Sequence, residues 1–297
     1  MANSIDSGVN NVIVANSAFQ AFQKKLQSFA AFSTSFSSEA AQPGSTIKVL
    51  KETYPDEAAA TKSANTAYTI QDADSTTVSI TLGQPIYTSF QLDDVERASS
   101  SVVGLERFAQ GKGNHVANAV LQTVWDDITN ANFASKVTVA TASFDLDDVY
   151  DMKDLLDDND APEDGRSLVL SNAVATNLLK DASITGNLNA GDAPLRQGSL
   201  GTIAGMDVYT TNVLPGNSEN LTGFACVSSA FAVGMRYLQP AAGHKYSRAE
   251  AVTDSSGITL GVREWYDENS GNQRCVMEAV VGSAVGQGTG LVRLVSA

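Results

Sequence analysis

The sequence predicts a mixed α+β fold, because helical and strand-like patterns occupy separate stretches of the chain. Val78, Ile80 and Leu82 alternate with threonine and serine, which is the pattern of a strand with one buried face. Between residues 114 and 131, apolar residues recur at helical spacing. After residue 215 the chain is rich in short apolar runs of strand length. Together these three patterns indicate the α+β class.

Length and composition allow a large core and disfavour general nucleic-acid binding. The 297 residues are 43% hydrophobic, and 33 acidic against 19 basic residues give a net charge of −14. Phosphate neutralisation needs a basic surface, so only a thin basic patch inside an assembly fits this balance. Cys226 and Cys275 lie in apolar runs and are expected to be reduced core thiols. No secretory signal and no membrane-spanning run is recognisable, so we expect no membrane partner.

Residues 1–44 are expected to form an N-terminal arm. Its middle carries large apolar residues at helical spacing, namely Phe19, Phe22, Leu26 and Phe29. Pro43 and Gly44 end the pattern. The helix could pack on its own domain or on a neighbouring subunit, and the sequence favours neither alternative.

Residues 45–83 are expected to form an extended two-stranded loop. Ile47 and Val49 alternate with polar residues, as Val78 to Leu82 do, but residues 51–75 supply almost no core side chains. A lone two-stranded ribbon is marginally stable in water. We therefore expect this ribbon to be ordered only by packing on another subunit.

Two helices are predicted in the middle of the chain. The first covers residues 114–131, with Gly111 and Gly113 marking its start. The second covers residues 144–160, with Asp145 placed to cap its first turn. Its acidic end, Asp157 to Asp160, is unfavourable for the helix dipole and is expected to be solvated.

The last third of the chain is expected to be mostly strands. Residues 258–262, 275–281 and 291–295 read as strands, and residues 286–290 read as a flexible glycine turn. Residues 229–238 are predicted to form a short helix.

Residues 161–215 carry the most distinctive motifs. The turn Pro162-Glu-Asp-Gly-Arg166 precedes an apolar strand and a helix whose N-cap is Ser171. A glycine-punctuated loop with Gly198, Gly201 and Gly205 then leads into a strand over residues 206–211. Glycines at this density indicate positive φ or close backbone approach. They do not indicate phosphate binding, because no helix follows them.

This arrangement resembles the central domain of major capsid proteins of tailed bacteriophages, which have the HK97-type fold. The resemblance rests on the order and spacing of these residues: Pro162 to Arg166, Val169 to Ser171, Arg196, Gly198, Gly201, Ile203 to Gly205, Val208, Tyr209 and Asn212 to Pro215. It implies an N-terminal arm (1–44), an extended loop (45–83) and a peripheral domain with a long spine helix (84–140). It further implies an axial domain (141–256) and C-terminal strands that return to both domains (257–297).

The sequence carries few patterns that suggest catalysis or metal binding, and each has a structural explanation. His115 and His244 have no ligand partner at metal-binding spacing. The aspartate run from Asp145 to Asp164 fails as a calcium loop, because Pro162 and Ser171 occupy ligand positions. Gly111-Lys-Gly113 lacks the spacing of a phosphate-binding loop. We expect no catalytic, cofactor-binding or metal-binding residues and no cofactor, so the chain is not expected to be an enzyme.

The resemblance implies a mechanical function. Many copies would form the hexamers and pentamers of an icosahedral shell around viral dsDNA, bound without sequence specificity. The expected partners are other copies of the chain, a separate scaffolding protein and a portal protein, with assembly in the bacterial cytoplasm and a final location in the virion. An encapsulin nanocompartment, which has the same fold, is the alternative. A metal-dependent hydrolase using the aspartate run is a less favoured one.

Overall fold

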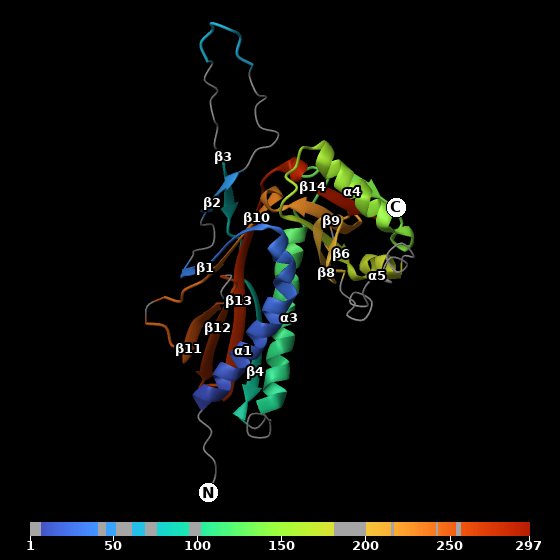
Figure 1. Ribbon diagram of the computed structural model, residues 1–297. Helices are drawn as coiled ribbons and strands as arrows, with labels where there is room; N and C mark the ends of the chain where they lie inside the picture. Colours follow the sequence, from blue (N-terminus) through green and yellow to red (C-terminus); the bar gives the residue numbers. More distant parts are fainter. Residues whose placement is uncertain are drawn as a thin grey trace.

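The protein folds into two β-sheets with helices packed on them, and a thin ribbon projects from the first sheet (Figure 1). The computed structural model describes residues 7–40, 46–51, 61–68, 76–94, 102–180, 200–214, 217–241, 243–253 and 257–297. The mixed α+β class predicted from the sequence is confirmed.

The first sheet is built around one long strand, β13 (Asn272–Val285). The strand order is β1-β10-β13-β12-β11, and β4 also pairs with β13. The other bounds are β1 (Ser33–Ala40), β4 (Ile86–Asp93), β10 (Phe231–Tyr237), β11 (Arg248–Thr253) and β12 (Thr259–Asp267). β1 comes from the predicted arm and pairs in parallel with β10. The axial domain was expected to extend to residue 256, but β10 and β11 already belong to the first sheet. The chain therefore returns to the first sheet earlier than expected.

Two long helices lie side by side on this sheet (Figure 1). They are α1 (Ser7–Lys25), which continues as the short helix η1 (Leu26–Ala31), and α3 (Val102–Trp125). The four apolar residues predicted to form one face of the N-terminal helix are all buried. Of the two alternatives that the sequence left open, the structure shows packing on the helix's own chain.

The second sheet contains the motifs of residues 161–215. Its order is β5-β14-β9-β6-β8-β7, and β6 (Arg166–Ser171) is buried along its whole length. The other bounds are β5 (Lys136–Thr138), β7 (Thr202–Ile203), β8 (Met206–Thr211), β9 (Leu221–Val227) and β14 (Leu291–Val295). The helices of this lobe are η2 (Thr141–Ser143), α4 (Leu146–Asp158) and α5 (Asn172–Lys180), and η4 (Ser228–Ala230) and η5 (Gly288–Gly290) are short turns.

Three predicted elements need correction. Residues 229–238 form strand β10 after a short turn, not a helix, because Phe231 to Met235 are buried on both faces and so show no alternation. α3 begins at Val102 and ends at Trp125, so Gly111 and Gly113 lie inside it. Residues 286–290 contain the helical turn η5, and Gly286 fits closely against the backbone of Ser229, so this segment is packed.

The ribbon consists of β2 (Thr46–Lys51) and β3 (Thr76–Thr81), paired antiparallel from Thr46↔Thr81 to Lys51↔Thr76. The predicted two-stranded ribbon is therefore confirmed. The expectation that only another subunit orders it is wrong for its base, because Ile80 and Leu82 are buried within their own chain. Ile80 packs over Gly234 of β10 and Gly282 of β13, where the missing side chains leave room.

The base of the ribbon should accordingly stabilise the isolated subunit. We expect Ile80→Ala to lower the free energy of unfolding by roughly 2–5 kcal/mol, because it removes buried methyl groups and leaves a cavity. Ser79→Ala, one residue away on the exposed face, is the matched control and should stay within about 0.5 kcal/mol of wild type. Urea unfolding of the unassembled subunit measures both. Equal stability of the two variants would contradict the packing described for Ile80.

The two glycines inside α3 should respond in opposite directions. A Cβ atom on Gly113 would lie 2.3 Å from the carbonyl oxygen of Ala18, whereas one on Gly111 would meet nothing within 4 Å. Gly113→Ala should therefore push α1 from α3 and destabilise the protein by about 1–3 kcal/mol. Gly111→Ala should stabilise it by about 0.5–1 kcal/mol through helix propensity alone. Thermal unfolding of both variants tests this, and a shift of the same sign in both would contradict close α1–α3 packing.

Candidate functional site

Possible metal ligands do not converge in the described part of the chain. Within the ranges that the structure covers, no group of three or more His, Cys, Asp or Glu side chains is placed to hold a metal ion. His115 is exposed on α3, and His244 is exposed in the segment before β11. Among the described helices, none is both long and apolar enough to cross a membrane. We take as the candidate site the surfaces that the chain presents to other molecules.

The ribbon is the most prominent of these surfaces, and it extends well away from both sheets (Figure 1). Its described tip, residues 61–68, turns at Ser63 to Thr66, where the backbone N–H and the hydroxyl of Thr66 both donate to the carbonyl of Ser63. Asn65 takes the left-handed conformation that this turn needs, with φ of 64°. The ring of Tyr68 is 78% exposed, and the Lys62 ammonium lies 4.2 Å from its centroid. A large exposed aromatic side chain at the end of a projecting ribbon is available to a partner.

The Pro162-Glu-Asp-Gly-Arg166 turn is held by its own arginine. Arg166 is 3% exposed, and its guanidinium donates to the carbonyls of Pro162 and Ala161 at 2.8 and 2.6 Å and to the carboxylate of Asp157 at 2.6 Å. Gly165 adopts a φ of +71°, which lets the chain reverse into β6. The motif therefore joins the end of α4 to the central strand of the second sheet.

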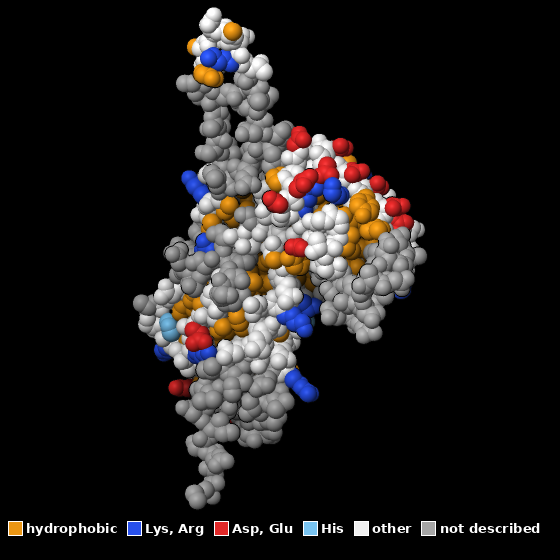
Figure 2. Space-filling view, in the orientation of Figure 1, with side chains coloured by type: hydrophobic (Ala, Val, Ile, Leu, Met, Phe, Trp, Pro, Cys, Tyr) orange, Lys and Arg blue, Asp and Glu red, His pale blue; other side chains and the backbone are white. Residues whose placement is uncertain are grey.

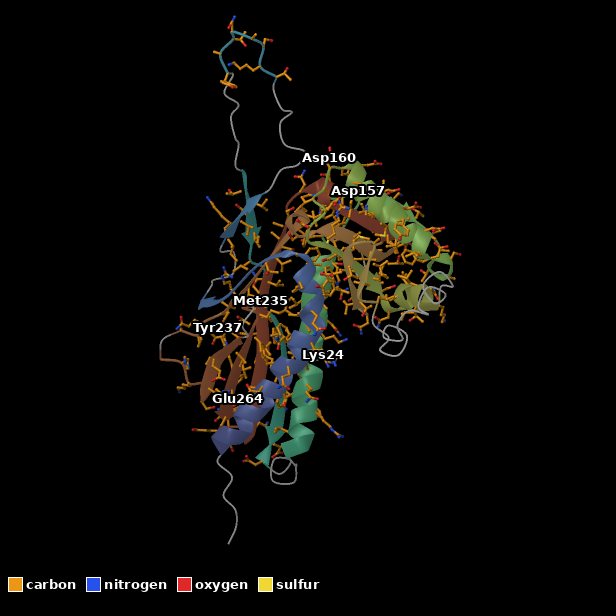
Figure 3. All side chains as sticks on the ribbon, viewed as in Figure 1. Lys24, Asp157, Asp160, Met235, Tyr237 and Glu264 are labelled. Carbon is orange, nitrogen blue, oxygen red and sulfur yellow. The ribbon has the colours of Figure 1, made fainter. Side chains whose placement is uncertain are left out.

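Helix α4 presents an acidic surface, and aspartates at both of its ends form hydrogen bonds or ion pairs that stabilise the fold. Asp145 accepts from the N–H groups of Asp147 and Asp148, and the Asp148 carboxylate accepts from the N–H of Asp145, which completes a capping box. The predicted cap is thus confirmed. At the other end, Asp158 and Asp160 are exposed, as predicted for this acidic stretch. Asp157 is 36% exposed but also pairs with Lys153 and Arg166, so it additionally anchors the turn. Figure 3 labels Asp157 and Asp160 at this end of α4.

The glycine loop forms a tight hairpin. β7 and β8 are joined by Ala204 and Gly205, both at positive φ (51° and 81°), which is the geometry of a type I′ turn. Gly201 also has positive φ, as the glycine density predicts, whereas Arg196 and Gly198 lie outside the described residues. The predicted N-cap Ser171 is confirmed, because its hydroxyl accepts from the N–H of Val174.

A buried arginine that the sequence did not reveal fixes the second sheet to the end of α3. Arg293 of β14 is 1% exposed and donates to the carbonyl of Phe133, to Glu219 and to Asn130 at 2.7, 2.6 and 2.6 Å. These acceptors are 74 to 163 residues away in sequence. No local pattern marks such an arginine, because Leu291 to Leu294 are all buried and β14 shows no alternation.

The Asp157 anchor gives a pH-dependent prediction. Hydrogen bonds from Lys153 and Arg166 hold the pKa of Asp157 below its ordinary value. A lowered pKa in the folded state stabilises the protein above the unfolded value of 3.8, and this contribution is lost as the pH falls through the folded pKa. Asp157→Asn should therefore lower the free energy of unfolding at pH 7, and the difference from wild type should shrink towards pH 3.

Asp154→Asn is the matched control for this prediction, because Asp154 lies on the same helix and is exposed. It should change stability little at either pH. Denaturant unfolding at pH 7, 5 and 3 measures the three proteins. A constant difference between Asp157→Asn and wild type across that range would show that the carboxylate charge does not stabilise the turn.

Comparison with known proteins identifies the fold. No family model and no curated protein matches this sequence. Solved structures do match over most of the chain. The capsid structure of cyanophage P-SCSP1u has a TM-score of 0.61 and 13% identity, covering 90% of this chain and 86% of the other. A virus-like particle from Pyrococcus furiosus gives 0.56 and 11%, covering 95% and 97%. A structure from Mycobacterium phage Che8 gives 0.54 and 18%, covering 84% of each chain.

These matches span both sheets, since they leave at most a sixth of the chain uncovered. At such low identity they report the fold and not the activity. They agree with the resemblance drawn from the motifs of residues 161–215. The chain has the mixed α+β, HK97-type fold found in phage capsids and virus-like particles.

Proposed function

We propose that this chain is a major capsid protein, the subunit of an icosahedral shell around the dsDNA genome of a tailed bacteriophage. The observation that carries the proposal is the combination of the shared fold with a ribbon that projects from the body and ends in an exposed tyrosine. A shell subunit needs surfaces that reach its neighbours, and this ribbon is such a surface. The role is mechanical and not enzymatic.

In this proposal each part of the chain has a place in the shell. The first sheet with α1 and α3 is the peripheral domain, α3 is the spine helix, and the second sheet is the axial domain that gathers at the centre of each hexamer or pentamer. The distal ribbon overlaps an adjacent subunit. A separate scaffolding protein and a portal protein complete the assembly in the bacterial cytoplasm, and the finished shell is part of the virion.

An encapsulin-type nanocompartment remains the second candidate. It is favoured by the likeness to the Pyrococcus furiosus virus-like particle, which covers 95% of this chain and 97% of the other. The contents of particles isolated from the natural source separate the two candidates. The phage reading expects dsDNA, whereas enclosed protein without a genome would support the nanocompartment.

Truncating the ribbon tests the shell function directly. Lys51 and Thr76 are paired across the ladder, so residues 52–75 can be replaced by Asn-Gly, which closes a two-residue hairpin. The buried base at Ile80 is kept, so the subunit should fold with unchanged helix and strand content. We expect the full chain of 31.1 kDa per subunit to form particles of MDa scale and the truncated chain to remain in small species.

Light scattering and electron microscopy measure the particles, and circular dichroism checks the fold. The experiment includes moderate salt, because subunits with a net charge of −14 repel one another until the repulsion is screened to about 8–10 Å. Shells formed equally well by the truncated chain would show that the ribbon does not join subunits. Failure of the full chain to exceed small oligomers across the salt range would count against the shell function itself.

A further inference from the structure

A groove lined by both polar and apolar side chains runs between the end of α1 and strand β8 of the second sheet. It consists of two neighbouring hollows of about 700 and 490 Å³, and Lys24 and Gln27 line both. Figure 3 shows Lys24 on the side of α1 nearer the second lobe. The groove therefore lies where side chains of α1, α3, α5 and β8 converge on one open space.

The lining of the groove suits an anion. Beside Lys24 and Lys25, the polar part of the lining consists of side-chain amides and hydroxyls, and neither hollow is lined by a carboxylate. The larger hollow also has an apolar wall, formed by Leu26, Phe29, Ala30 and Ile258. The Lys25 ammonium donates to the amide oxygen of Asn212 at 2.9 Å, which holds it beside the groove. Lys24 is exposed and forms no ion pair with a carboxylate of the described residues. The amide groups of Gln20, Gln27 and Asn172 add neutral donors that phosphate oxygens can accept from.

The charges of the chain are segregated in a way that leaves this groove positive. Residues 7–38 contain Lys24 and Lys25 and no acidic residue. In contrast, ten of the 33 acidic residues fall within residues 145–164. Figure 2 shows these acidic side chains gathered over α4, apart from the basic ones beside the end of α1. Because charges farther apart than about 8 Å are largely screened in physiological salt, the groove can attract an anion despite the net charge of −14.

We propose that this groove contacts the phosphate backbone of the nucleic acid enclosed by the shell, with Lys24 and Lys25 as the phosphate-binding residues. The inference rests on the proposed function and adds the contact surface to it. Two ammonium groups and several amides would bind phosphate oxygens and not the base edges, so the contact is independent of base identity. One subunit binds weakly through two phosphates, and repetition of the groove in every subunit of a shell multiplies the effect.

The test measures binding of the unassembled full-length subunit to a fluorescent duplex DNA of mixed sequence, so that it does not depend on shell formation. Observed affinity should fall with salt with a log–log slope of about −1.8, since each phosphate contact contributes about −0.9. Lys24→Ala and Lys25→Ala should each lower the affinity roughly tenfold at 50 mM salt and make the slope shallower by about 0.9. Lys24→Arg should retain binding, because it retains the charge.

Lys245→Ala is the matched control, because Lys245 is exposed in the segment before β11 and outside the groove. It should bind DNA like wild type. Loss of affinity equal to that of Lys24→Ala would show diffuse surface attraction and overturn the groove. A second arm replaces DNA by a polyaspartate peptide. Binding of the peptide but not of DNA would also overturn the proposal, and would assign the groove to an acidic protein segment.

Particle mass, measured separately, keeps the two proposals distinct. Variants that form shells but do not bind DNA as unassembled subunits are expected if the groove is the phosphate contact. If wild-type subunits form shells but show no lysine-dependent DNA binding, the proposed phosphate contact is wrong and the proposed shell function is unaffected. If the subunits bind DNA through these lysines but form no shells, the proposed shell function is contradicted and the groove remains a phosphate-binding site.

Discussion

The structure depends on one aromatic cluster, at which every layer of the molecule meets. Trp125 at the end of α3 lies 5.2 Å from Phe224 of the second sheet, measured between ring centroids, and 5.6 Å from Phe32. Phe32 stacks on Phe224 at 5.7 Å and contacts Phe231 of the first sheet at 5.3 Å. Such contacts contribute about 0.5–1.5 kcal/mol per pair beyond the burial of apolar area. Because the rings come from both sheets, from α3 and from the N-terminal segment, they fix how the two lobes are oriented.

The buried arginines continue this joint with directional bonds. Apolar packing sets distances between elements but tolerates small rotations, whereas a planar guanidinium with several fixed acceptors does not. Arg293 binds the loop that follows Trp125, and Arg166 binds the end of α4, so both act where a helix turns into the second sheet. Each also satisfies carbonyl groups that burial would otherwise leave without a donor.

Local patterns in the sequence predicted local structure correctly. Where the structure differs from the prediction, the cause is packing between elements that are distant in the sequence. Alternation located the ribbon, and side-chain chemistry located the caps at Asp145 and Ser171. β10 was missed because burial on both faces removes alternation, and the start of α3 was misplaced because Gly113 serves close contact with α1 instead of ending a helix. The groove between α1 and β8 could not be predicted at all, since its residues come from α1, α3, α5 and β8 and share no spacing along the chain.

The seat of Ile80 on Gly234 and Gly282 also has a geometric consequence. These two glycines are paired across β10 and β13, so together they form a flat floor under the ribbon base. The described tip lies much farther out than this base (Figure 1). The floor belongs to the same sheet as β1, which follows directly from the N-terminal helices. The ribbon base is thus seated on the strand pair that also holds β1, so a force applied to this base would act on the sheet that carries the N-terminal segment.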